Sequence, residues 1–382
     1  MLSSDYITKR DEIIKQFSED INIWEDDFTT GKFNLVSAGL HNYLPQIPYE
    51  EHEPIFKKIL MHQRLSLLEQ SYQEVLKYLT CEGLSEEKSS LLKSGGCIIC
   101  TFHTGSYRIV NHILTKNEMP FTLVVAKSVL ESQGAEIAKL HRLFTGAAGE
   151  AAVGMIDAES ASAGLQMLKE LKKGKNLVLY IDGNAGSGDD QSEKNNLCSV
   201  QFLAQSVFAR KGIAFLAHIA KVPILPVVGY RKGSDDIRLK FFSPIYPDLN
   251  ESRESFSQIA TQKIYDCAAP IIEAYPEQWE AWSYLHKSVH ITHPKPIKNA
   301  LPTPVKIIMP NDLLMFNSRE YGVFKIQEDS YLFRKADYTS FPIEDQLFTK
   351  LQDANKSAIR CKEIDADLFY ELYENEVLIP CQ

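Results

Sequence analysis

Short apolar runs alternate with helical patterns in the middle of the chain, and this order constrains the fold more than any other feature. Residues 97–101 (CIICT), 121–126 (FTLVVA) and 177–181 (LVLYI) are each long enough for a buried strand and too short for a buried helix. Helical patterns such as residues 163–173 separate them. Alternation of this kind implies right-handed crossovers between parallel strands. We therefore expect an α/β fold with a mixed, mainly parallel sheet flanked by helices.

His103 follows the first of these strands and precedes the helical pattern of residues 107–114. This turn lies where open α/β sheets bind ligands, between a strand's carboxyl end and a helix's amino end. Thr104, Gly105 and Ser106 complete the turn. Unpaired N–H groups at a helix start favour anions and developing oxyanions, which makes these residues candidates for substrate binding. The alternative is a structural histidine with a satisfied hydrogen bond.

Asp182 follows the third strand, and the polar segment 183–196 (GNAGSGDDQSEKNN) comes directly after it. A carboxylate at this end of a strand, in the same sheet as His103, is a candidate partner for the histidine. The polar segment is either plain surface or a lid over a site.

Composition limits the functional classes. The chain has 382 residues, 44% apolar, and a net charge of -9. It can bury one large core and a small second domain. The acidic balance argues against nucleic-acid binding. Seven scattered cysteines predict reduced thiols with no disulfide and no metal site. Without a signal sequence or a run of ~20 apolar residues, we expect a soluble, cytoplasmic protein.

Further helical and strand patterns flank this region. Residues 6–30 and 53–80 predict amphipathic helices that pack on the core, with weak peripheral membrane contact as the alternative. Residues 208–231 predict a helix and then a strand marked as an edge by its prolines, with Arg231 within reach of an anionic group. A further edge strand is expected at 239–244, and a helix kinked or interrupted at Pro270 follows.

Taken in order, four pieces of the sequence resemble the lysophospholipid and lipid A late acyltransferases. These membrane-associated enzymes move a fatty acyl chain from acyl carrier protein onto a hydroxyl. The pieces are CTFHTGSYR, LKKGKNLVLYIDGNAGSG, SVQFLAQSVFARKGIAFLAHIAKVPILPVVGYR and PEQWEAWSYLHK. They cover about residues 55 to 290. The third piece contributes Arg210 and Arg231 as candidates for binding substrate.

The resemblance implies a general base and an acyl thioester co-substrate, with no other cofactor and no metal. His103 is the candidate base that takes a proton from the attacking hydroxyl or amine. Gly105 would let the backbone approach the thioester, and N–H groups at the helix start would hold the oxyanion.

One position departs from the family pattern, which places an acidic residue five positions after the histidine. Here that residue is Arg108, which would depress the pKa of the imidazole. Arg108 at this position allows three interpretations. Asp182 supplies the carboxylate from the neighbouring strand, or the acceptor is an amine that needs less help from a general base, or the domain is an inactive binding scaffold. Arg108 itself is a candidate for binding an anionic group of the substrate, such as a carrier-protein phosphopantetheine.

The sequence predicts a separate small module in the C-terminal part of the chain. We expect an acyltransferase-like domain over residues 1–295, a proline-rich linker over 296–310 and an α+β module over 311–382. The module's hairpin at 321–334, two helices and final short strand resemble peptide-binding winged-helix modules that recognise leader peptides. A structural cap on the main domain, or another interaction module, is the alternative.

These observations predict a soluble acyltransferase. The donor would be acyl carrier protein or acyl-CoA, and the acceptor a peptide or small molecule of specialised metabolism. The competing class is an inactive acyltransferase-like protein that binds a carrier protein or peptide.

Overall fold

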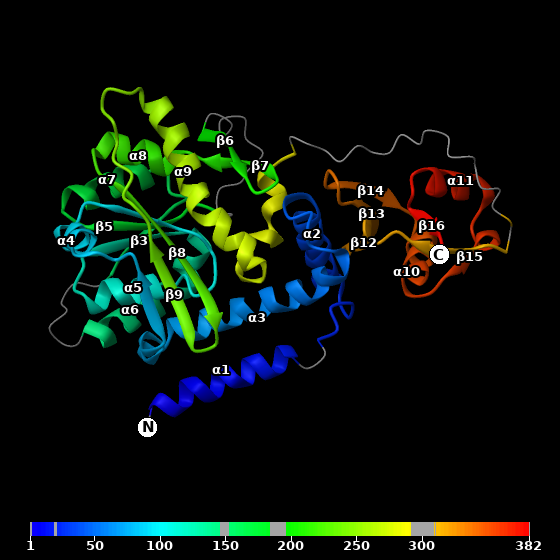
Figure 1. Cartoon of the computed structure of the whole chain (residues 1–382), viewed down its shortest axis with the longest axis horizontal. Coiled ribbons are helices and arrows are strands. Elements are labelled where there is room, and N and C mark those ends of the chain that lie inside the picture. The colour runs from blue at the N-terminus through cyan, green and yellow to red at the C-terminus, as the bar shows by residue number, and fades with distance from the viewer. Residues whose placement is uncertain are drawn as a thin grey trace. The chain divides into compact units, whose positions relative to one another are not determined.

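The computed structural model describes residues 2–18, 21–145, 153–183, 196–291, 309 and 311–381 (Figure 1). Most of the polar segment 183–196 and nearly all of the expected linker 296–310 therefore lie outside the described residues. The chain divides into two compact units. One unit comprises Met1–Ile21 and Lys57–His290, and the other comprises Asn22–Phe56 and Ile291–Gln382.

The first unit is built on a seven-stranded sheet with the order β1-β9-β8-β2-β5-β3-β4. The five strands from β8 to β4 are mutually parallel. In contrast, β9 runs antiparallel to β8 and parallel to β1. The mixed, mainly parallel sheet expected from the sequence is confirmed. The strands are β1 (Leu79–Glu82), β2 (Ile98–Thr101), β3 (Phe121–Val125), β4 (Gly154–Asp157), β5 (Asn176–Tyr180), β8 (Ile224–Gly233) and β9 (Asp236–Phe241).

Helices cover both faces of this sheet, which explains why its inner strands are apolar without alternation. Figure 1 shows α5 (Ile109–Lys116) and α6 (Lys127–Thr145) on one side, with α7 (Ala163–Lys172) and α8 (Gly212–Ala220) on the other. α8 also contacts α9 (Arg253–Ala274). α1 (Leu2–Ser18), α4 (Glu86–Ser94) and most of α3 (His52–Gln70) complete the helices of this unit. One core cluster joins Ile99, Val178 and Leu225 of the strands to Ile109 and Val110 of α5.

A second, antiparallel sheet of this unit was not expected from the sequence. It contains β6 (Leu197–Phe202), β7 (Gln205–Arg210) and β10 (Val289–His290). Leu203 turns the β6–β7 hairpin with a positive φ of 54°.

Several expected elements are corrected. β8 is an inner strand, because it pairs with β2 through Pro226 and with β9 from Val227 onward. Pro226 therefore marks a change of partner and not a sheet edge. β9 is likewise internal, because β1 pairs with its outer edge. The first two residues of β1 fall in the range 53–80 that was expected to be helical. α9 continues through Pro270 without interruption.

The second unit contains two small three-stranded sheets and three α-helices among its described residues. The orders are β15-β11-β16 and β12-β13-β14. The elements are α2 (Asp27–Tyr43), β11 (Leu313–Phe316), β12 (Tyr321–Ile326), β13 (Asp329–Arg334), β14 (Thr339–Ile343), α10 (Asp345–Lys356), β15 (Ile359–Arg360), α11 (Ala366–Glu374) and β16 (Leu378–Pro380). The hairpin, the two later helices and the last strand were expected. The resemblance to winged-helix modules stays a prediction.

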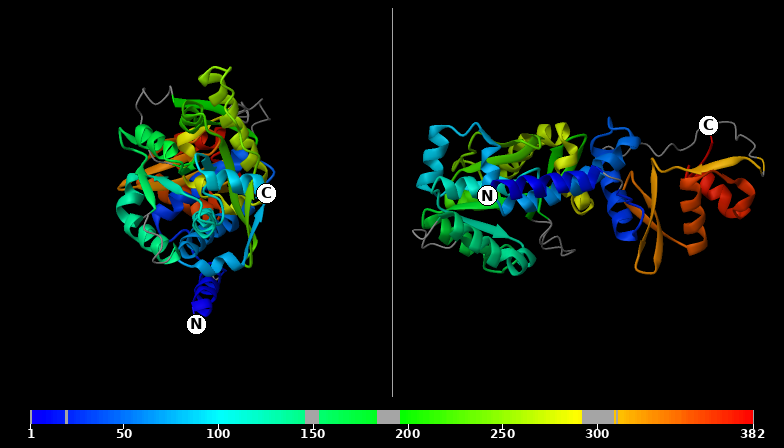
Figure 2. Two further views of the ribbon diagram at one scale, coloured as in Figure 1. Left: turned by 90° about the vertical axis from the view of Figure 1, so that its left-hand side faces the viewer. Right: turned by 90° about the horizontal axis from the view of Figure 1, so that it is seen from below.

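α2 packs against β12 inside this unit, as Figure 2 also shows. Asn34 donates from Nδ2 to the backbone oxygen of Val323 (3.0 Å), and Asn42 donates to that of Lys335 (2.7 Å). A Cβ on Gly322 would lie 2.2 Å from Asn34 Oδ1, so a larger residue there would displace the Asn34 amide that bonds Val323. Residues 22–56 thus belong with the C-terminal module, whereas the sequence placed them in the first domain. An amphipathic pattern shows that a helix has a buried face, but not what covers it.

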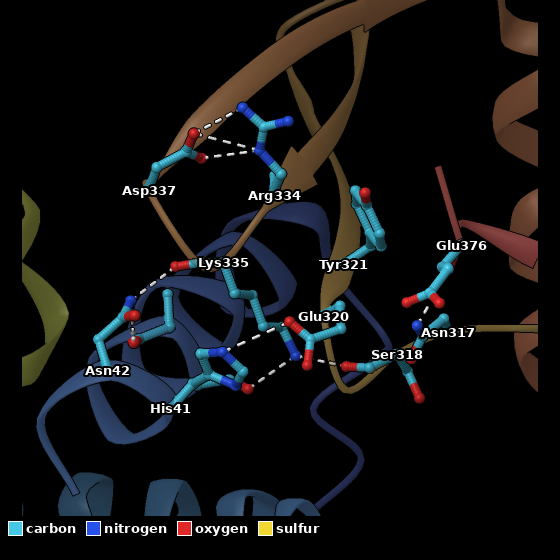
Figure 3. Close-up of polar contacts among 12 residues, drawn as sticks. His41, Asn42, Asn317, Ser318, Glu320, Tyr321, Arg334, Lys335, Asp337 and Glu376 are labelled. Atoms are coloured by element: carbon cyan, nitrogen blue, oxygen red, sulfur yellow. Dashed lines mark hydrogen bonds and ion pairs between the residues drawn. The ribbon is translucent and has the colours of Figure 1, made fainter. Parts of the chain in front are cut away.

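The buried side chain of Lys335 links α2 to the C-terminal segment of this unit (Figure 3). Lys335 is fully buried. Its Nζ donates to Ser37 Oγ (2.8 Å) and to the backbone oxygen of Ser318 (2.6 Å), and it lies 4.4 Å from the ring centroid of Tyr49. Burial lowers the pKa of Lys335 to about 7, although the Glu320 carboxylate partly opposes this. A neutral amine is therefore present in much of the folded protein near neutrality.

We expect the stability of this unit to rise with pH above about 7. The unfolded chain keeps the Lys335 proton up to its ordinary pKa of 10.5, whereas the folded unit releases it near 7. In this window the unfolded state binds more protons, so raising the pH by two units adds up to ~2.7 kcal/mol to the free energy of unfolding.

Urea unfolding at pH 7 and pH 9 measures this dependence. Lys335→Met should remove it, whereas Lys362→Met, at an exposed lysine of the same unit, should retain it. An equal rise of stability with pH in wild type and Lys335→Met would contradict the assignment.

Candidate active site

The register of two neighbouring strands brings His103 and Asp182 together. Thr101 of β2 pairs with Tyr180 of β5, so the residues two positions beyond each strand meet at the same edge of the sheet. His103 Nδ1 lies 2.8 Å from Asp182 Oδ1. The backbone N–H of His103 also donates to Asp182 Oδ2 at 3.0 Å. The sequence-based pairing of these residues therefore agrees with their geometry.

Trp279 completes the support of the carboxylate. Its indole Nε1 donates to Asp182 Oδ2 at 2.7 Å. The Asp182 side chain is 3% exposed and that of His103 is 22% exposed. With Nδ1–H directed at the carboxylate, the ring presents its other nitrogen, Nε2, in the form that accepts a proton. Burial of the ring disfavours its charged form, but Asp182 outweighs burial and raises the pKa of His103 above its usual value.

Two tyrosines hold the imidazole in place. The ring of Tyr180 stacks on His103 with centroids 4.7 Å apart, and the ring of Tyr107 meets it edge-on at 4.9 Å. Rotation of the imidazole would need both rings to move. The His103–Asp182 pair, called the dyad below, is thus fixed in orientation as well as in tautomer.

The turn after His103 is packed against the segment that carries Trp279. Gly105 donates its N–H to the backbone oxygen of Gln278 (2.9 Å), and Glu280 donates its N–H to that of His103 (2.9 Å). Gly105 has φ +55°, and a Cβ there would lie 2.8 Å from Tyr230 Cα. Glycine is required here for close packing, and its N–H is occupied. This corrects the expectation that Gly105 lets the backbone approach a thioester.

The other candidates of this turn are less accessible than the sequence suggested. Thr104 and Ser106 are both fully buried, and neither hydroxyl has a hydrogen-bond partner among the described residues. The first N–H groups of α5 are also engaged: that of Ile109 donates to the Ser106 oxygen (3.0 Å) and that of Asn111 to the Arg108 oxygen (3.2 Å). Neither group is thus free to bind an oxyanion.

The three candidate arginines lie in different surroundings. Arg108 donates from Nη1 to Gln70 Oε1 (3.0 Å), and its guanidinium lies 4.8 Å from the centroid of the Tyr107 ring. Arg210, half-buried, is the last residue of β7 in the second sheet and pairs with Leu197.

Arg231 is buried in an ion pair. It contacts Glu69 through Nη2–Oε2 (2.6 Å) and Nε–Oε1 (3.2 Å), and its Nη1 lies 2.9 Å from His62 Nδ1. Protein groups thus occupy this guanidinium, which corrects its predicted contact with an anionic substrate group.

Sequence reasoning missed four residues of this site. Tyr107 and Tyr180 flank the imidazole ring, and Trp279 donates a hydrogen bond to Asp182. The half-buried Glu280 interacts electrostatically with His103 and Asp182. Burial raises the pKa of the Glu280 carboxyl, although His103 and Arg108 oppose this. The PEQWEAW motif could have indicated Trp279 and Glu280 as site residues, but a motif does not predict which residues they contact.

Within the described ranges, no group of three or more His, Cys, Asp or Glu side chains is arranged to hold a metal ion. The same part of the chain contains no helix with the length and apolar character needed to cross a membrane.

Comparison with known proteins identifies the family to which this chain belongs. The sequence profile of the bacterial lipid A biosynthesis acyltransferases matches residues 40–288, which include His103, Asp182 and Trp279. The chain belongs to this family. The protein is therefore an acyltransferase.

The search of curated proteins gave no match. Among solved structures, the chain resembles the 1-acyl-sn-glycerophosphate (LPA) acyltransferase PlsC from Thermotoga maritima, at 12% sequence identity and a TM-score of 0.33. The alignment covers 64% of this chain and 95% of that one.

We predict that Asp182→Asn lowers the pKa of His103 by at least ~1 unit, because the carboxylate that stabilises the imidazolium is lost. An asparagine oxygen still accepts from His103 N–H and from Trp279, so the fold is expected to persist. NMR titration of the imidazole resonances measures this, with His218 on α8 as the internal control. A His103 pKa that is unchanged in a folded variant would show that Asp182 does not set the charge of the ring.

Proposed function

We propose that this acyltransferase moves an acyl group from a carrier-protein or CoA thioester to a hydroxyl or amine acceptor, with no other cofactor. The observation that carries the proposal is the His103–Asp182 pair, held by Trp279 in a chain of the lipid A acyltransferase family.

The proposed reaction uses His103 as the general base. Its Nε2 takes the proton of the acceptor's hydroxyl or amine while the acceptor oxygen or nitrogen attacks the thioester carbonyl carbon. The tetrahedral intermediate then expels the thiolate as the C–S bond breaks, and the imidazolium returns the proton to sulfur. Asp182 orients the ring and stabilises the imidazolium without itself becoming protonated.

The contact at 2.8 Å supports the first of the three readings of Arg108, in which Asp182 replaces the acidic residue of the family pattern. An amine acceptor is compatible with the same geometry. The competing proposal is an inactive protein that binds a carrier protein or peptide, and Arg108 is the observation that favours it. The two differ in whether His103 is needed for turnover.

We further infer a role in specialised-metabolite or modified-peptide biosynthesis in the cytoplasm. In this proposal the C-terminal unit recognises the acceptor. Strand addition at β12 would need that edge to be open, but α2 covers part of it, since Asn34 binds the Val323 oxygen. The opposite edge strand, β14, is largely exposed and contains Pro342. β14 is thus the more exposed edge for a peptide, although the peptide would have to pair with it on either side of Pro342, which has no N–H to donate.

The test is His103-dependent turnover of acyl thioesters. Acyl carrier protein and CoA thioesters of several chain lengths are incubated with candidate acceptors, and thiol release and product mass are recorded. His103→Ala should lower turnover by ~10² or more, because a general base is lost. His218→Ala, on α8 away from the dyad, should stay within twofold of wild type.

Two results would contradict the proposal. Turnover within a few-fold of wild type in His103→Ala would make this histidine structural. Tight binding of acyl carrier protein without any thiol release would favour the inactive binding protein.

A further inference from the structure

Glu280 has a carboxylate beside the dyad that the reaction proposed above does not use. Its segment lies against the turn that carries the base, because the Glu280 N–H donates to the backbone oxygen of His103 (2.9 Å) and Thr104 forms an antiparallel bridge with Trp279. Of the charged groups that act on the Glu280 carboxyl, His103 has the largest effect. The carboxyl therefore lies close to the imidazole.

The Glu280 carboxylate has no partner among the described residues. The side chain is half-buried, and neither oxygen forms a hydrogen bond or an ion pair there. Neither oxygen is fully enclosed, in contrast to the unpaired hydroxyls of Thr104 and Ser106 nearby. Both Glu280 oxygens therefore remain within reach of a ligand.

Two arginines act on the Glu280 carboxyl without binding it. Arg108 Nη1 donates to Gln70 Oε1 (3.0 Å), and Arg231 is paired with Glu69 (Nη2–Oε2, 2.6 Å). Both guanidinium groups act to lower the pKa of Glu280, but burial outweighs them and raises it. Charges that are partly removed from water are normally paired in folded proteins. The unpaired carboxylate thus fits a cation that a ligand supplies.

We propose that the Glu280 carboxylate binds the ammonium group of a primary amine, and that this amine is the acyl acceptor. This acceptor narrows the reaction proposed above, on which the assignment rests, to transfer onto nitrogen. A carboxylate and an ammonium match in charge, so their attraction adds to the hydrogen bond between them. A hydroxyl would gain the hydrogen bond alone.

The proton balance of the reaction also favours an amine at this position. An ammonium has three protons on nitrogen and the amide product keeps one, so two must leave. Glu280 takes the first, which frees the lone pair that attacks the thioester carbonyl carbon, and later releases it to water. His103 Nε2 takes the second as the C–N bond forms and returns it to sulfur as the C–S bond breaks. A hydroxyl loses only one proton, for which His103 alone suffices.

Two phenol groups near Glu280 suit the same ligand. Tyr107 and Tyr284 each interact electrostatically with Glu280, and burial raises the pKa of both phenols well above the usual value, so they stay neutral. Neither hydroxyl has a hydrogen-bond partner within the described ranges, so both can accept from further N–H groups of an ammonium. Aromatic rings also attract cations. The surroundings of Glu280 therefore favour a bound ammonium over an anion.

Calorimetry with two probes of equal size tests the binding step. The probes are Nα-acetyl-lysine methylamide and its analogue with a hydroxyl in place of the ε-amine. Wild-type protein should bind the amine about tenfold more tightly than the alcohol, or better. Glu280→Gln, which keeps the shape and removes the charge, should abolish this preference. Glu277→Gln, at the nearest glutamate of the same segment, should retain it.

Mass spectrometry of the products tests the transfer step. With octanoyl-CoA as donor, and with rates corrected for the reaction without protein, wild type should acylate the amine about tenfold faster than the alcohol, or more. Glu280→Gln should lower this ratio by a similar factor. Equal affinities for the two probes, an unchanged preference in Glu280→Gln, or ester as the main product would each overturn the assignment.

Failure of the transfer reaction itself has a different signature. Absence of thiol release with both probes would contradict acyl transfer, and the binding comparison would then decide on Glu280 alone. If Glu280→Gln does not fold, the comparison of the two probes on wild type decides.

Discussion

The parallel pairing of β2 with β5 is the constraint on which the site depends. Because Thr101 and Tyr180 are partners in the ladder, His103 and Asp182 leave the sheet side by side. A slip of one residue in this register would turn every side chain of a strand to the opposite face. The sheet's buried apolar residues on both faces resist such a slip, so core packing and catalytic geometry are fixed by the same contacts.

Burying a carboxylate next to the base requires compensation, and the surrounding donors provide it. Asp182 accepts hydrogen bonds from the backbone of His103, from its ring and from the Trp279 indole. An ionised carboxylate with such partners is tolerated in a site that is almost closed to water. The segment 278–280 thus supports the dyad from the far end of the domain's sequence, and its hydrogen bonds to Gly105 and His103 keep it there.

Local patterns predicted the fold class and the dyad, because strand ends of a parallel sheet meet at one edge. They did not predict Trp279, whose partner lies 97 positions earlier, since no periodicity links an indole to a distant carboxylate. Arg231 was misassigned for the same reason, because Glu69 precedes it by 162 positions.

The second unit joins chain segments from far apart in sequence, and this has a consequence for its synthesis. Asn34 and Val323, which are hydrogen-bonded, are separated by 289 positions. During synthesis, the face of α2 that packs against β12 therefore stays uncovered until nearly the whole chain has left the ribosome. Such long-range contacts form slowly and leave apolar surface exposed in the meantime. A chain that ends prematurely, before β12, would leave this face of α2 permanently without its partner.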